Sequence, residues 1–222
     1  MNARRSAMST RLRGGSSPLS RAFSAISLAL CCTVLTTGTS GASTQTVTET
    51  KYGLSFTLPA QWQRIPLTGS DVSGLLDLLS KADPSMRSSL TNEVKQAAKE
   101  GIKIFAIGPI TNQFASNMNV IVEPQSTGPS MSGYFDELGV EVKLNLTNAG
   151  MKKITTSKVH WSQGDVLQAT YTLHLASPKE AVKGIQDYVW HKGRIFVVTF
   201  SAAKLSTDLL VAKLVSQSWH WS

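Results

Sequence analysis

The sequence of 222 residues is poor in cysteine and histidine. Its two cysteines, Cys31 and Cys32, both lie in the first 42 residues, so the remainder has neither a disulfide nor a thiol nucleophile and its stability depends on a hydrophobic core. No H-E-x-x-H motif is present, and the histidines are never three or four residues apart: His160, His174, His191 and His220. The sequence therefore predicts no metal and no cofactor.

Motifs typical of catalysis are also missing. There is no G-x-S-x-G, no phosphate-binding P-loop and no G-x-G-x-x-G. Glu137 and Glu141 are four residues apart on an expected helix, which is typical of a solvated face and not of an acid–base pair. We predict a non-enzymatic protein, with an unrecognised serine hydrolase as an alternative.

The first 42 residues have the layout of a secretory signal. Five arginines and no acidic residue accompany an apolar run over 22–35, which small residues follow at 39–42. The run is shorter than the roughly 20 residues that span a bilayer. Cleavage after Ala42 would release a secreted or envelope protein. Lipidation at Cys31 or Cys32 is the alternative, although Leu30 is larger than a lipoprotein signal prefers, and an uncleaved anchor is a third possibility.

The basic charge of the chain comes mainly from this leader. The formal net charge is +8, but residues 43–222 hold 17 basic and 14 acidic residues, a net charge of +3. That balance is ordinary for a soluble domain, and no basic cluster is interleaved with aromatic residues. We predict no nucleic-acid partner, and contact with a membrane only through the leader or a lipid anchor.

The remaining pattern predicts a short exposed linker over 43–50 and one domain over 51–222. Alternating or continuous apolar residues indicate strands, and three- and four-residue spacing indicates helices, including a helical insertion at about 70–100. The expected strands are 54–58, 102–107, 118–122, 152–161, 165–176, 185–191 and 194–201, and the other helices are 130–150 and 204–219. Trp62 is expected to fold back over the sheet edge.

Two hairpin turns are expected, at 162–164 and at Lys192-Gly193. If Trp161 shares the apolar face of Leu167, His160 lies opposite Gln168. Strands in hairpins with helices at intervals predict an α+β fold, an α/β/α sandwich with a central antiparallel sheet and helices packed on it.

Several phrases resemble PsbP-like domains, closest to the LpqN-type actinobacterial secreted proteins and lipoproteins. These are Tyr52-Gly53-Leu54-Ser55-Phe56-Thr57-Leu58-Pro59 with Trp62, Phe114-Ala115-Ser116-Asn117-Met118-Asn119-Val120, Ile195 to Ser201, and Ser218-Trp219. The resemblance covers about 50–222. It implies the same sandwich and a mostly non-catalytic family whose members dock on other proteins or sit in the bacterial envelope. It implies no catalytic residue.

Two groups of residues are candidate binding sites. The last helix should bury Leu205, Leu209, Ala212, Val215 and Trp219 and leave a second apolar stripe near its opposite face, formed by Leu210, Leu214 and Trp221. That stripe predicts a partner patch, unless the helices at 70–100 cover it. Asn117 and Asn119 either present amides to a ligand or hydrogen-bond nearby loop backbone.

We therefore expect a secreted or envelope-associated binding or assembly protein whose partner is an envelope protein. The alternative is a carrier of an apolar small molecule or lipid in the envelope. Such a carrier needs a cavity between the sheet and the helices at 70–100, lined by residues such as Leu75, Leu79 and Met86.

Overall fold

The protein is described here from a computed structural model, which describes residues 43–65, 101–111, 114–124, 131–174, 181–202 and 205–222. The leader with Cys31 and Cys32, and the helical insertion expected at 70–100, lie outside the described residues.

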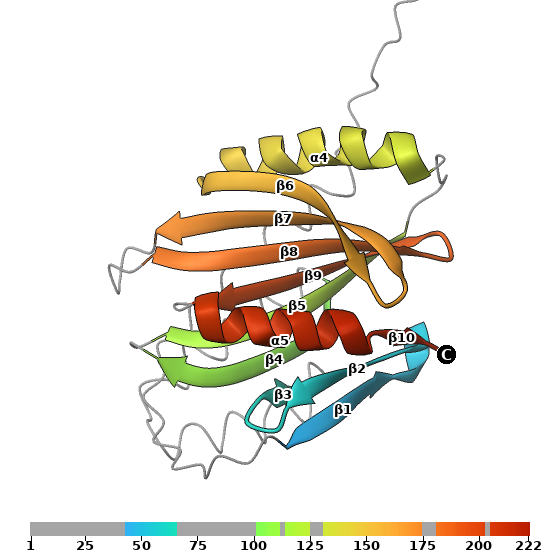
Figure 1. Cartoon of the computed structure of the whole chain (residues 1–222), viewed down its shortest axis with the longest axis vertical. Helices are drawn as coiled ribbons and strands as arrows, with labels where there is room; N and C mark the ends of the chain where they lie inside the picture. The colour runs from blue at the N-terminus through green and yellow to red at the C-terminus, as the bar shows by residue number, and fades with distance from the viewer. Residues whose placement is uncertain (1–42, 66–100, 112–113, 125–130, 175–180, 203–204) are drawn as a thin grey trace, which may run out of the picture.

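A seven-stranded antiparallel sheet forms the centre of the molecule, in the order β3-β4-β5-β9-β8-β7-β6 (Figure 1). Its strands are β3 Gln63–Ile65, β4 Ile102–Thr111, β5 Phe114–Pro124, β6 Lys152–Trp161, β7 Gly164–His174, β8 Ala181–His191 and β9 Arg194–Ala202. The strands expected from sequence are confirmed, and most are longer than expected.

A second sheet has three strands in the order β1-β2-β10, namely β1 Thr44–Glu49, β2 Leu54–Pro59 and β10 His220–Trp221. The linker predicted over 43–50 is therefore wrong. Its threonines favour extended backbone, Val47 is buried in the core, and every residue of β1 pairs with β2 across the short 3-10 helix Thr50–Tyr52.

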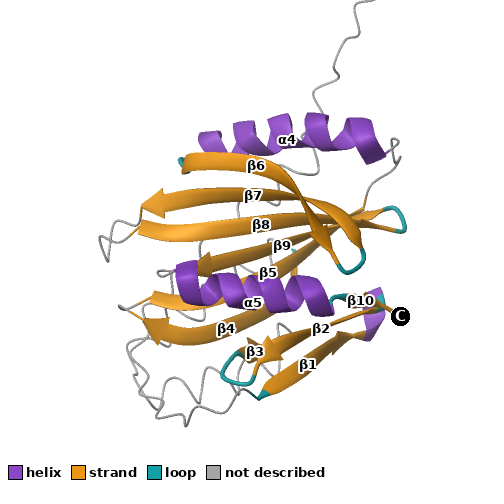
Figure 2. Ribbon diagram, in the orientation of Figure 1, coloured by secondary structure: helices purple, strands orange, loops and turns teal. Residues whose placement is uncertain are grey.

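The two described helices lie on opposite faces of the seven-stranded sheet (Figure 2). Helix α5, Leu205–Ser218, packs with the small sheet on one face, which we call the α5 face. Helix α4, Met131–Asn148, lies over β6 and β7 on the other, the α4 face, and Gly139 brings its backbone close to Thr156 and Leu167. The predicted α/β/α sandwich is confirmed.

The α5 face is packed by aromatic rings. Trp219 stacks on Phe56 with ring centroids 5.4 Å apart and meets the edge of Trp161 at 5.3 Å. Trp62 folds over β4 as expected, because a Cβ on Gly108 would lie 2.5 Å from its ring. This cluster joins both sheets and α5 in one core.

One of the two expected hairpins has the predicted turn, and the other has a different register from the one expected. Lys192 and Gly193 both have positive φ, at 45° and 72°, as the predicted two-residue turn requires. In the β6–β7 hairpin the expected register is wrong, because Trp161 pairs with Gly164 and His160 with Asp165. The turn is held by α5, since the Ser162 hydroxyl donates to the Trp219 carbonyl at 2.7 Å.

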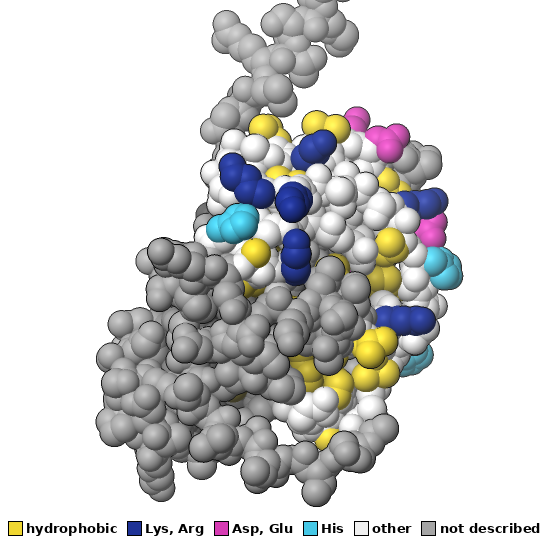
Figure 3. Space-filling view, turned by 60° about the vertical axis from the view of Figure 1, so that its left-hand side comes forward, with side chains coloured by type: hydrophobic (Ala, Val, Ile, Leu, Met, Phe, Trp, Pro, Cys, Tyr) yellow, Lys and Arg dark blue, Asp and Glu magenta, His cyan; other side chains and the backbone are white. Residues whose placement is uncertain are grey.

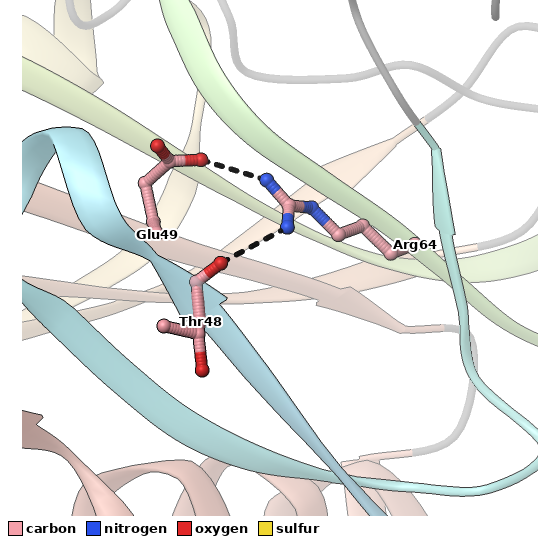
Figure 4. Close-up of polar contacts among 3 residues, drawn as sticks. All are labelled: Thr48, Glu49 and Arg64. Carbon is pink, nitrogen blue, oxygen red and sulfur yellow. Dashed lines mark hydrogen bonds and ion pairs between the residues drawn. The ribbon is translucent and has the colours of Figure 1, made fainter.

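Polar contacts tie the edge strand β3 to the small sheet (Figure 4). Arg64 Nη2 lies 2.7 Å from Glu49 Oε2, and Arg64 Nη1 donates to the Thr48 carbonyl at 3.2 Å. The Gln45 side chain donates to the Trp62 carbonyl close by. The first strand of the domain is thus fixed to the edge of the large sheet.

Candidate functional site

The outer side of α5 carries part of the predicted partner patch. Leu210 is 67% exposed and Leu214 is half-buried, whereas Val211, Ala212 and Val215 on the inner side are buried. Where the side chains are described, the two faces lie as the helical periodicity predicted, and the side chains of Leu205 and Leu209 lie outside the described residues.

Trp221 does not belong to this helix face. The helix ends at Ser218, whose hydroxyl donates to the Leu214 carbonyl at 2.7 Å and accepts from the Thr57 amide at 2.8 Å. Trp221 then enters β10 and stacks on His191, with ring centroids 4.0 Å apart and planes 5° apart. The patch expected from sequence is divided, and its exposed centre is Leu210.

A second exposed apolar pair lies on α4 and was missed by the sequence analysis. Val140 is 72% exposed and Leu144 is 58% exposed. Their four-residue spacing opposite the buried Leu138, Val142 and Leu146 was the signal that could have located them.

The α4 face of the sheet contains a buried polar row formed by Asn119, Thr199 and Gln186 on adjacent strands. Gln186 Nε2 donates to Thr199 Oγ1 at 3.1 Å, and the Tyr188 hydroxyl donates to Gln186 Oε1 at 2.6 Å. Asn119 is only 3% exposed, and its Oδ1 has no hydrogen-bond partner. The asparagines thus lie inside the sheet, where buried polar atoms are normally paired.

Tyr171 adds a second unpaired atom to the same face. Its ring lies across Gly184, where a Cβ would come within 2.2 Å of the ring carbons. Its hydroxyl is buried without a partner, and burial raises the pKa of this phenol. Gly184 is therefore required by the close approach of Tyr171.

One carboxyl is buried on the α5 face. Asp187 pairs with Val198 and Gln168 across the sheet, and Gln168 Nε2 donates to its Oδ1 at 2.9 Å. Burial raises the pKa of Asp187 to about 7, and the hydrogen bond from Gln168 only partly offsets this. Asp187 is thus a carboxyl that changes charge near neutral pH.

The histidines are separated by the sheet. His160 Nδ1 lies 3.0 Å from Asp165 Oδ1 on the exposed hairpin, and Lys158 lies 2.9 Å from the other carboxylate oxygen. These two hydrogen bonds lower the pKa of Asp165. His174 lies on the opposite face of the sheet from His160. Within the described residues, no three His, Cys, Asp or Glu side chains are grouped to hold a metal ion.

Comparison with known proteins identifies the fold of the chain. No protein-family model matches the sequence, and no curated protein matches it. The solution structure of cyanobacterial PsbP (CyanoP) from Synechocystis has a TM-score of 0.53 at 14% identity, covering 86% of this chain and 99% of that chain. The fold is PsbP-like. The crystal structure of LpqN, involved in cell envelope biogenesis of Mycobacterium tuberculosis, has a TM-score of 0.45 at 10% identity, over 80% of this chain and 89% of LpqN.

The PsbP-like fold expected from the sequence phrases is therefore confirmed. At these identities the comparison concerns the fold alone, and function has to be argued from the surface of this chain. Across the ranges that the structure describes, no helix is long and apolar enough to cross a bilayer.

Proposed function

We propose that the protein is a non-catalytic binding module of the bacterial cell envelope, exported by its leader, and that it docks on an envelope protein through the outer side of α5. The carrying observation is Leu210, a large apolar side chain that is 67% exposed on a helix whose described inner side chains, Val211, Ala212 and Val215, are buried. A protein that exposes such a residue beside the half-buried Leu214 has a nucleus for an interface.

The packing beneath α5 supports docking through a rigid surface. Trp219, Phe56 and Trp161 fill the core below the helix, and Ser218 fixes the helix end to β2. Interface affinity is highest where the contacting side chains are already ordered, because less conformational freedom is lost on binding. The fold thus presents Leu210 without rearrangement.

Site-specific photocrosslinking tests this proposal in the native envelope. A benzophenone amino acid at position 210 should crosslink to one defined protein, whereas the same group at exposed position 137 on α4 should not. Leu210→Asp should abolish the capture of that protein, and Lys213→Ala on the same helix should retain it. Equal crosslinking from positions 210 and 137 would exclude α5 as the docking surface.

A second candidate function is carriage of a small envelope molecule with a polar group. It is favoured by two buried polar atoms without partners on the α4 face, Asn119 Oδ1 and the Tyr171 hydroxyl. The apolar wall expected from Leu75, Leu79 and Met86 lies outside the described residues. Native mass spectrometry of the exported protein should show a bound molecule that Tyr171→Phe weakens. A single unliganded mass from freshly prepared protein would reject the carrier.

A further inference from the structure

Strand β6 has a bulge near its beginning that changes the direction of one lysine. Lys152 pairs with Thr172 and Thr155 pairs with Thr170, so three steps along β6 face two steps along β7. Residues three apart on a regular strand point to opposite faces. The extra residue therefore brings Lys152 and Thr155 to the same face of the sheet.

The bulge has an energetic cost. Lys153 has φ 52°, in the left-handed region that a residue with a Cβ adopts at a cost of about 1 kcal/mol. Lys192, with φ 45°, is the other described non-glycine residue with positive φ, but it forms a tight hairpin turn that requires this conformation. The left-handed conformation of Lys153 belongs to the bulge itself, and bulges are often found where a side chain is re-aimed for function.

The side chain that the bulge places joins a basic row. Lys152, Thr172 and Lys183 pair across β6, β7 and β8, and Lys183 Nζ donates to Thr172 Oγ1 at 2.9 Å. With strands about 4.8 Å apart, the two lysine backbones are roughly 10 Å apart. His174 is two residues further along β7 on the same face and is exposed. The two lysine ammonium groups repel one another unless an anion lies between them.

No carboxylate in the described strand segments at this end balances them, although Asp208 follows in the first turn of α5. The segments 148–157, 168–174, 181–186 and 198–202 contain three lysines, one histidine and no Asp or Glu. The connections 175–180 and 203–204, outside the described residues, contain two lysines and one glutamate. Figure 3 shows dark-blue side chains gathered around a histidine on this end, with the magenta carboxylates of that view lying apart.

We propose that this basic end, defined by Lys152, Lys153, Lys183 and His174, binds the headgroups of an anionic phospholipid bilayer. The described large apolar side chains that are exposed, Val140, Leu144 and Leu210, are not among these residues. Protein interfaces usually have an apolar or aromatic centre. A patch of long cations suits phosphate groups, and each lysine near an anionic bilayer contributes about 1 kcal/mol.

Vesicle sedimentation of the exported protein, freed of its leader, tests the proposal. We expect binding at low salt to vesicles of phosphatidylcholine with phosphatidylglycerol and none to phosphatidylcholine alone. Lys152→Gln with Lys183→Gln should weaken binding about 25-fold, since each lysine contributes about fivefold. Lys192→Gln, a lysine with the same backbone conformation at the opposite hairpin end, should leave binding unchanged. Equal binding to the two kinds of vesicle would overturn the proposal, as would a loss of binding in Lys192→Gln as large as that in the double variant. Absence of any binding would also overturn it and would indicate an acidic protein as the partner instead.

Deleting Lys153 tests the role of the bulge. Regular pairing would turn Lys152 to the other face, so binding should fall about fivefold further than in Lys153→Gln, which removes the same charge and keeps the bulge. Identical losses would show that the bulge does not place Lys152. Circular dichroism shows whether the deletion variant folds. If it does not, the Lys152→Gln with Lys183→Gln variant still decides whether the basic end binds the bilayer.

The basic end shares no residue with the docking side of α5, although its lysine row lies on the same face of the sheet as that helix. Leu210→Asp should leave vesicle binding unchanged. Loss of vesicle binding in that variant would mean that a single surface serves both contacts and would contradict a separate lipid site.

Discussion

The two faces of the seven-stranded sheet are both buried, but they are stabilised in different ways. On the α5 face, rings from both sheets pack around Trp219, the residue that follows α5. On the α4 face, a row of amide and hydroxyl side chains crosses the middle of the sheet, and Asn119 Oδ1 and the Tyr171 hydroxyl are left unpaired. Apolar packing gains from every contact, whereas a buried polar row gains only where each atom has a partner.

We therefore expect the α5 face to provide most of the stability, although Trp219 Nε1 in its core is also buried without a partner. Each face also contains an exception. Asp187 is a carboxyl on the apolar side, and the Tyr188–Gln186–Thr199 chain is a satisfied network on the polar side.

The largest effect is expected for Trp219→Ala on the α5 face. The side chain is 1% exposed and contacts four other rings, those of Phe56, Trp161, Phe196 and Trp221, so its removal should lower the free energy of unfolding by about 4 to 5 kcal/mol. Urea unfolding measures this loss. Trp221→Ala, which removes a half-buried ring two residues away, is the matched control and should cost clearly less. Equal losses would contradict a core centred on Trp219.

The second prediction concerns Asp187 and pH. In the unfolded chain its carboxyl ionises near pH 4, whereas in the fold its pKa is about 7. Between these values the folded state binds more protons than the unfolded chain. The contribution of Asp187 to the free energy of unfolding is therefore fully present below pH 4 and is lost as the pH rises, by at most about 1.4 kcal/mol per pH unit. Asp187→Asn keeps an acceptor for Gln168 and should be the more stable form at pH 7.5, by up to roughly 4 kcal/mol.

Urea unfolding of both proteins between pH 4.5 and pH 7.5 measures the difference. Asp165→Asn is the control with the opposite sign, because the pKa of Asp165 is lowered and its contribution is lost as the pH falls. Parallel pH profiles for wild type and Asp187→Asn would show that Asp187 is ionised in the fold at all these pH values.

A smaller effect should distinguish the two tyrosines of the α4 face. Tyr188→Phe removes a hydroxyl that donates to Gln186 and should cost about 1 to 2 kcal/mol. Tyr171→Phe removes a hydroxyl without a partner and should leave stability unchanged or raise it by about 1 kcal/mol. Unfolding of the two variants in parallel gives the comparison. A substantial loss in Tyr171→Phe would mean that a molecule bonds this hydroxyl in solution.

The smallest effect is expected at the junction of the sheets, for the partly exposed pair of Arg64 and Glu49. A double-mutant cycle of Arg64→Ala and Glu49→Ala should give a coupling of about 0.5 kcal/mol that decreases with added salt. Coupling above about 2 kcal/mol would show that this ion pair contributes as much as apolar packing.

Much of the fold could be predicted because it is local. Alternation along β7 and the helical periodicity of α4 each depend on neighbouring residues, and the Lys192-Gly193 turn depends on two. The predictions were wrong where the local structure depends on residues that are distant in the sequence. Residues 43–50 become a strand only because β2 is available for pairing. The register of β6 with β7 differs from the expected one next to Ser162, which is held at the end of α5.

The candidate sites show the same limit. Periodicity placed Leu210 on the outer side of α5, but it could not place Trp221, because the helix ends where Ser218 meets Thr57, 161 residues earlier in the chain. The asparagines Asn117 and Asn119 were identified as polar residues of interest. The burial of both, and the row that Asn119 forms with Thr199, could not be inferred, since they depend on the pairing of β5 with β9.

The sequence by itself determined most strands of the large sheet, the described parts of the helix faces and the second hairpin turn, because spacing and backbone preference act within a few residues. Tertiary structure alone decided which polar atoms lost their partners, why Asp187 holds a proton near neutral pH, and how a bulge gathers Lys152 with Lys183. These properties depend on burial and on pairing between strands, and a chain acquires both only when remote segments pack together.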